Sequence, residues 1–147
     1  YKRQIQRRYV ALVWGNFDED EGTITGNIGR SPKDRQKMWV FEDGSDGKHA
    51  VTHYRVLKRY GYVTLIECRL ETGRTHQIRV HMAHIGHPLL GDLVYGHKRP
   101  EKGLSGQCLH ARALRFLHPR TGELVTFTCP LPDYFQDVLA RLGPPVG

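Results

Sequence analysis

The sequence RLETGRTHQIRVHMAHI, residues 69–85, spans the change of hydrophobic period that decides the fold. In residues 62–70, apolar side chains recur at a period of two, which predicts a half-buried strand. In residues 75–85, apolar side chains recur at i, i+4 and i+7, which predicts a helix. The apolar face of the strand comprises Tyr62, Ile66, Cys68 and Leu70, and that of the helix comprises Ile78, Met82 and Ile85.

Local signals set the expected ends of this helix. Thr75 is a residue type that caps helix N-termini, and Gly86 followed by Pro88 is a typical stop. Because His76 and Arg79 are three residues apart, the helix brings them to one face beside the apolar residues.

The rest of the chain reads mainly as short strands between turns. Further strands are expected over residues 9–14, 23–28, 38–41, 51–57, 110–117 and 124–129. A terminal helix is expected over residues 133–142, capped by Asp133 and stopped at Gly143. The sequence therefore predicts an α+β fold, with a largely antiparallel mixed β-sheet and a few helices. Residues 1–143 are expected to form one domain and residues 144–147 a flexible tail.

Composition narrows the class of protein. The chain has 147 residues, 39% of them hydrophobic and 25% charged, which is typical of one globular domain. No window is apolar enough to span a membrane. Three scattered cysteines favour a reducing compartment, and hence a cytoplasmic protein. The formal net charge of +7 suits a polyanionic partner such as RNA.

The start of the predicted helix gathers cations. Arg74, His76 and Arg79 surround helix N-terminal amides, which together make a natural anion site. Arg79 directly follows a core position, so its guanidinium should be partly buried and needs a carboxylate or a phosphate as partner. A structural ion pair with Asp92 is the alternative interpretation from the residues alone.

Several motifs resemble the ribosomal large-subunit pseudouridine synthase family. The longest is RLETGRTHQIRVHMAHIGHPLLGDLVYG at residues 69–96. RRYVALVWG at residues 7–15 and AVTHYRVL at residues 50–57 match in the same order. LHARALRFLHPRTGE at residues 109–123, followed by CPLP at residues 129–132, resembles the closing segment of the family. The similarity covers nearly the whole chain.

The resemblance implies an enzyme that isomerises uridine to pseudouridine in RNA, in particular in 23S-type ribosomal RNA. That reaction needs no cofactor and no metal. The target nucleotide must leave its stack, and the resemblance assigns Tyr9 as the surface on which its base lies. The resemblance also assigns Arg79 as the cation that holds a nucleophilic aspartate in a bidentate pair.

Other basic and polar residues are expected to contact RNA. The candidates are Arg74, His76, Gln77, His110 and Arg112. The basic loops over residues 30–37 and 98–102 are either phosphate contacts or merely solvated. The clustered histidines lack carboxylate or cysteine neighbours at ligand spacing, so no metal site is expected.

One element of the family pattern is missing from these 147 residues. The family carries its nucleophilic aspartate in an H-R-L-D motif before the Tyr9 strand, and no aspartate here follows Arg-Leu. The chain alone is therefore expected to be inactive. Arg79 is expected to lack its partner and to depend on an N-terminal segment, a second copy or a bound anion. A non-catalytic RNA-binding module of the same fold is the alternative function.

Overall fold

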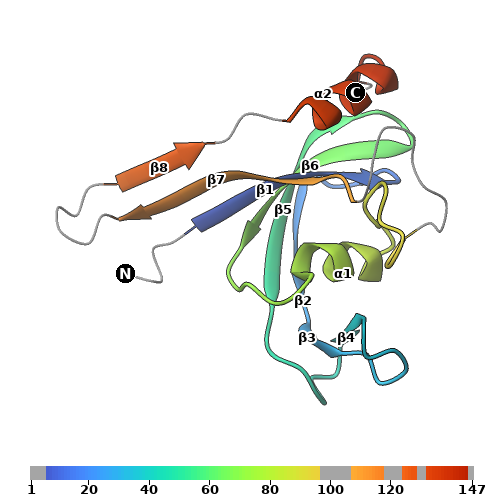
Figure 1. The fold of residues 1–147 in the computed structure, drawn as a ribbon, viewed down its shortest axis with the longest axis vertical. Helices are drawn as coiled ribbons and strands as arrows, with labels where there is room; N and C mark the ends of the chain where they lie inside the picture. Colours follow the sequence, from blue (N-terminus) through green and yellow to red (C-terminus); the bar gives the residue numbers. More distant parts are fainter. Residues whose placement is uncertain (1–5, 97–106, 118–123, 129–131, 146–147) are drawn as a thin grey trace.

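The computed structural model describes residues 6–96, 107–117, 124–128 and 132–145, with residues 6, 7, 111–117 and 124–128 described by their backbone alone. A six-stranded sheet dominates this part of the chain (Figure 1). Its order is β2-β5-β6-β1-β7-β8, and each of these pairs is antiparallel. The strands are β1 (Gln6–Trp14), β2 (Glu21–Thr25), β5 (Val51–Arg59), β6 (Val63–Leu70), β7 (Leu109–Leu117) and β8 (Leu124–Thr128). The predicted α+β class is confirmed.

A separate two-stranded sheet is formed by β3 (Asn27–Arg30) and β4 (Met38–Phe41). The sequence predicted one strand over residues 23–28, which is wrong because the chain leaves the large sheet at Gly26. A Cβ at this glycine would lie 2.7 Å from Val40, so the crossing between the sheets has no room for a larger residue. This crossing places the β3–β4 hairpin against the next helix rather than along β5.

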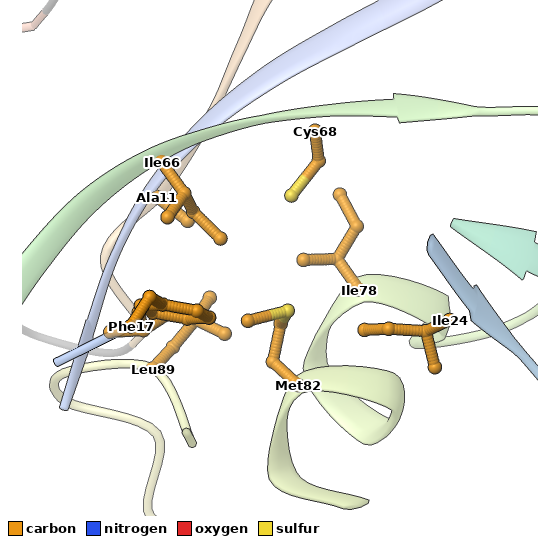
Figure 2. Close-up of a cluster of buried hydrophobic side chains, with 9 residues drawn as sticks. Ala11, Phe17, Ile24, Ile66, Cys68, Ile78, Met82 and Leu89 are labelled. Carbon is orange, nitrogen blue, oxygen red and sulfur yellow. The ribbon is translucent and has the colours of Figure 1, made fainter. Parts of the chain in front are cut away.

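Helix α1 (Gln77–His84) lies between the large sheet and the β3–β4 hairpin (Figure 1). On one side, Ile78 and Met82 point into a buried cluster with side chains of the large sheet (Figure 2). On the other side, Val80 packs with side chains of the hairpin. The cluster under α1 contains Ala11, Val13, Phe17, Ile24, Ile66, Cys68, Ile78, Met82 and Leu89. The apolar period predicted for this helix is therefore confirmed.

Both ends of α1 are informative. The predicted cap at Thr75 is wrong, because the N-cap residue is His76, which has a left-handed backbone with φ 55° and makes no side-chain capping bond. The predicted stop is confirmed. Gly86 has φ 88°, its N–H donates to the carbonyl of Ala83, and the N–H of His87 donates to the carbonyl of Met82. A glycine is needed there because other residues rarely adopt that backbone conformation.

Helix α2 (Asp133–Leu142) covers the opposite face of the large sheet. Its buried side chains, Phe135 and Val138, pack with Val10, Leu12, Val63, Leu65, Leu90 and Cys108. The helix bounds match the prediction, but the cap does not. Pro132 is the N-cap residue, and Asp133 is the first helical residue without a side-chain capping bond. Gly143 ends the helix at φ 78°, as predicted.

The sequence also led to expectations for Tyr62 and for the cysteines. Tyr62 was placed on the buried face of its strand, which is wrong: its side chain is 61% exposed in the tight turn before β6. Cys68 and Cys108 are free and buried, and burial raises the pKa of each thiol to about 12. Cys129 lies outside the described residues. Among the described helices, none is long and apolar enough to cross a membrane.

Candidate active site

The side chain of Arg79 projects from the first turn of α1 and is only 12% exposed. Its Nε donates to Oδ2 of Asp92 at 2.8 Å, and its Nη2 donates to Oδ1 at 3.1 Å. This is the bidentate geometry in which a guanidinium fits a carboxylate best. The expectation that Arg79 lacks a partner is therefore wrong. The alternative that the residues alone had left open, an ion pair with Asp92, is what the structure contains.

Asp92 is fully buried and accepts hydrogen bonds from two directions. Besides Arg79, its Oδ1 accepts the backbone N–H groups of Val94 and Tyr95 at 3.1 Å each. Burial alone raises the pKa of this carboxyl. The hydrogen bonds and the charge of Arg79, with the two backbone donors, outweigh burial and bring the pKa below its usual value. Asp92 is therefore a permanent anion that braces both a turn and the arginine.

Tyr95 closes the other side of Arg79. The Cζ atom of Arg79 lies 5.1 Å from the centroid of the Tyr95 ring, which is cation–π distance. The Tyr95 hydroxyl lies 2.7 Å from Nδ1 of His76 and accepts the N–H of Met38 at 2.9 Å. The guanidinium is thus fixed along one edge by a carboxylate and on one face by an aromatic ring.

His76 sits directly beside this group in a strained backbone conformation. A left-handed residue other than glycine costs on the order of 1 kcal/mol or more, and such residues cluster at functional sites. Burial lowers the pKa of the His76 imidazole, the charges of Arg79 and Arg30 lower it further, and the charge of Asp92 raises it. The ring is therefore neutral at pH 7, rather than a second cation beside Arg79.

Tyr9 lies on β1, on the sheet face that carries α1. Its half-buried ring packs against the cluster that contains Ile78, the residue before Arg79. The pairing of β1 with β7 shifts at this point, since Arg8 faces Ala113 and Tyr9 faces Ala111. Arg112 is therefore the extra residue of a β-bulge opposite Tyr9. Bulges beside active sites commonly redirect a side chain.

The sequence of the chain and its fold are both similar to those of known proteins. The sequence model of the RNA pseudouridylate synthase family matches residues 1–84, which is more than half of the chain. The chain belongs to this family. The match includes both Tyr9 and Arg79.

Two relatives illustrate the similarity in sequence. The Bacillus subtilis (strain 168) protein named uncharacterized RNA pseudouridine synthase YlyB is 52% identical over 140 residues, which cover 95% of this chain and 45% of the relative. Ribosomal large subunit pseudouridine synthase D of Xanthomonas campestris pv. campestris is 45% identical over 152 residues, covering 95% of this chain and 45% of that protein. The chain thus spans about half the length of the curated relatives that it matches.

Solved structures of the pseudouridylate synthase family show the same fold. Human RNA pseudouridylate synthase domain containing 1 superposes with a TM-score of 0.75 and 33% identity, over 99% of this chain and 61% of that one. Human RNA pseudouridylate synthase domain containing 4 gives a TM-score of 0.76 and 27% identity, over 96% and 63%.

Gln77, a candidate RNA contact, is instead an internal residue of this pseudouridylate synthase domain. It is 3% exposed, and its Nε2 donates to the carbonyl of Val51 and to Oγ1 of Thr52, each at 2.9 Å. Its Oε1 accepts from Oγ1 of Thr72 at 2.7 Å and from the N–H of Arg74 at 3.0 Å. With its amide satisfied inside the protein, the geometry favours a structural role.

The same network continues to His81, which the sequence did not single out as a buried group. Thr52 Oγ1 lies 2.8 Å from Nδ1 of His81, and Nε2 of His81 donates to the carbonyl of Gly26 at 3.1 Å. Burial lowers the pKa of His81, so the ring is a neutral structural element. Its spacing of four from Gln77 was the signal for this shared face.

Arg74 borders a groove of about 500 Å³ between the loop before α1 and the β3–β4 hairpin. Its Nε donates to the carbonyl of His49 at 2.8 Å, which holds the side chain along the groove wall. Arg30 and Lys48 line the same groove, with one acidic residue, Asp46. The net positive lining suits a phosphate backbone.

The structure describes only some of the remaining candidate RNA contacts. His110 lies on β7 opposite Val10, and its Nε2 is buried without a hydrogen-bond partner among the described residues. The side chain of Arg112 and the basic loop over residues 98–102 lie outside what the structure describes. Within the described part of the chain, no three histidine, cysteine or acidic side chains come close enough to hold a metal ion.

Proposed function

We propose that this chain forms the tyrosine and arginine side of a pseudouridine synthase active site that acts on large-subunit ribosomal RNA in the cytoplasm. In the reaction, the N1–C1′ bond of a uridine breaks and a C5–C1′ bond forms, while the hydrogen at C5 leaves as a proton and N1 takes up a proton. The observation that supports the proposal is that Tyr9 packs against the cluster under α1, the helix that carries Arg79, and that both residues lie within the span matched by the family.

Tyr9 is suited to receive a flipped base. Its ring is half-buried, so one part is fixed by the core while another part stays accessible. Stacking of a base on an aromatic side chain contributes about 1–3 kcal/mol and tolerates any base. The bulge at Arg112 lies opposite Tyr9 in the pairing of β1 with β7.

The role of Arg79 toward the nucleophile follows from the hydrogens that Asp92 leaves unused. Asp92 takes Nε–H and one hydrogen of Nη2, and among the described residues Nη1 has no hydrogen-bond partner. An incoming aspartate can bind the Nη1 side. Because Asp92 already balances the charge, Arg79 orients this nucleophile rather than ionising it. An aspartate with an ordinary pKa of about 3.9 is ionised at pH 7 without help.

The groove at Arg74 supports RNA as the substrate. Its three cations come from the loop before α1, from β3 and from the loop after β4, and Arg74 is two residues from His76 in the sequence. Contacts of this kind supply affinity without sequence preference. They suit the structured RNA of a ribosomal subunit, where shape rather than sequence guides the protein.

The direct test is release of tritium from large-subunit ribosomal RNA labelled at C5 of uridine, using the full protein that contains this chain. Wild type should release tritium, and Tyr9→Ala should lower the rate about 5- to 150-fold, which corresponds to ~1–3 kcal/mol of lost stacking. Tyr62→Ala, at an exposed tyrosine in the turn before β6, is the matched control and should behave as wild type.

Residues 1–147 tested alone should release no tritium, because none of their aspartates follows Arg-Leu. Salt-sensitive RNA binding by the full protein with no tritium release would instead support the alternative, a non-catalytic RNA-binding module. Turnover by residues 1–147 of verified mass would overturn the assignment of the nucleophile to another segment.

A further inference from the structure

Tyr95 contacts every fixed group around Arg79. Its ring lies against the guanidinium, its backbone N–H donates to Asp92, and its hydroxyl joins His76 on α1 to Met38 on β4. A residue that merely completed a turn would need none of the side-chain contacts. The hydroxyl in particular lies between two elements that are otherwise joined by apolar packing.

The hydrogen bonds at this hydroxyl restrict where the protons can lie. The N–H of Met38 can only donate, so the Tyr95 oxygen is its acceptor. A phenol has one proton, and the remaining close partner is Nδ1 of His76 at 2.7 Å. With the phenol proton donated to Nδ1, the neutral imidazole carries its own proton on Nε2.

We propose that Tyr95 is a positioning residue that holds Arg79 and His76 as one unit and makes His76 present Nε2–H to an oxygen of the RNA backbone. The His76 side chain is partly exposed, and its Nε2 has no hydrogen-bond partner among the described residues. The cationic groove beside it brings the backbone within reach. This inference rests on the proposed function, since it assumes RNA at this site.

The charges around His76 agree with a neutral donor. Arg79 from α1, Arg30 from β3 and Asp92 from the following turn act on the imidazole, and Tyr95 is its direct partner. Burial and the two arginines hold its pKa below the usual value, against the pull of Asp92. A neutral ring can serve as a fixed hydrogen-bond donor over the whole physiological pH range.

Two substitutions at His76 separate its two nitrogens. Glutamine carries its amide nitrogen about where Nε2 lies, whereas asparagine carries it about where Nδ1 lies. Asparagine also tolerates the left-handed backbone of this position, so its effect is not a folding defect. In the full protein, His76→Gln should keep RNA affinity within about threefold of wild type, and His76→Asn should weaken it about tenfold, as expected for one lost hydrogen bond.

The control for these variants is the same pair of substitutions at His84, which lies farther along α1 and pairs with Glu42 at 2.7 Å. Neither should change RNA affinity. Because the proposed contact is neutral, His76→Asn should leave the salt dependence of binding unchanged, while Arg74→Ala should reduce its slope by about one. Equal affinity of His76→Asn and His76→Gln would overturn the proposed donor.

Tyr95→Phe tests the positioning role, because it keeps the ring against Arg79 and removes only the hydroxyl. In nitrogen-15 spectra of the full protein, Nδ1 of His76 should be unprotonated in wild type, and the pKa of His76 should rise in Tyr95→Phe. The KM for RNA should rise about tenfold, with kcat changed less, since the guanidinium keeps its ring contact. An unchanged His76 pKa together with an unchanged KM would overturn the role of Tyr95. These readouts remain valid if no pseudouridine forms, because the spectra and RNA affinity do not depend on turnover.

Discussion

The two helices cover opposite faces of one sheet and are held there by different forces. Helix α2 docks through apolar side chains, with Phe135 and Val138 buried among aliphatic residues. Helix α1 also buries apolar side chains, but Gln77 and His81 lie beside them and Arg79 is nearly buried at its first turn. Each of these polar groups has hydrogen-bond partners within the protein.

The difference shows what each helix is for. Apolar burial is non-directional, so α2 stabilises the sheet without fixing any chemical group. Hydrogen bonds and ion pairs are directional, so α1 fixes the position of Arg79 and His76 at some cost in desolvation. Substitutions on α2 should therefore change stability alone, whereas substitutions around α1 should change both stability and the handling of RNA.

The largest effect on stability is expected on α2. Phe135 is fully buried, so Phe135→Ala should lower the free energy of unfolding by about 3–5 kcal/mol through lost contacts and a cavity. RNA affinity of the fraction that remains folded should not change. Urea unfolding followed by binding assays in low urea measures both quantities. A weakened affinity in the folded fraction would show that the two faces are coupled.

Asp92→Asn should lower the free energy of unfolding by about 3 kcal/mol, because Arg79 then lies nearly buried without a countercharge. Unlike Phe135→Ala, this variant should also lower kcat in the folded fraction, since Arg79 is no longer held. Urea unfolding and tritium release check the two effects. Asp20→Asn is the control, because the carboxylate of Asp20 pairs with Arg59 on the surface. A fully active Asp92→Asn enzyme would contradict the positioning of Arg79 by Asp92.

Gln77→Ala sharpens the comparison within α1. It leaves buried partners in the loop before the helix and on β5 unsatisfied, so the free energy of unfolding should fall by about 1–3 kcal/mol. Gln36→Ala, at an exposed glutamine in the loop before β4, should change it by less than about 0.5 kcal/mol. Equal effects in thermal or urea unfolding would mean that the buried amide network contributes nothing.

The smallest effect is a dependence of stability on pH. Burial lowers the pKa of His81 in the folded chain below the unfolded value of about 6.5. At a pH between these two values, the unfolded chain binds a proton at His81 and the folded chain does not. The free energy of unfolding should therefore be greatest above about pH 6.5 and should fall as the pH drops below that value. The lowered pKa of His76 should contribute to the same decrease. His81→Gln should flatten this slope in urea titrations from pH 7.5 to 5.5. An unchanged slope in His81→Gln would exclude the buried imidazole as its source.

Much of the fold could be predicted because periodicity reports which face of an element is buried. The spacing of Ile78 and Met82 predicted α1, and the bounds of α2 matched. Two predictions were wrong, the cap at Thr75 and the unbroken strand over residues 23–28, because tertiary contacts decide both features. The bond from Tyr95 to His76 and the crossing at Gly26 depend on residues distant in sequence, which local patterns do not report.

For the candidate site, the sequence indicated which residue types matter better than it indicated which residues touch one another. Spacing pointed to a partly buried Arg79 and offered Asp92 as one partner, and the structure contains that pair. Gln77 was expected to contact RNA, but its position on the helix turns its side chain inward. Tyr95 carried no signal beyond its place after Asp92, since a cation–π contact and the hydrogen bonds of its hydroxyl leave no trace in spacing.

The central claim, that the face carrying α1 holds a geometrically fixed arginine for pseudouridine synthesis, is tested most directly by Arg79→Lys in the full protein. Lysine keeps the charge but cannot make a bidentate pair. The rate of tritium release from C5-labelled ribosomal RNA should fall about a hundredfold, while Arg59→Lys, at a pair on the edge of the sheet, should leave it unchanged. A turnover of Arg79→Lys equal to wild type would contradict the account.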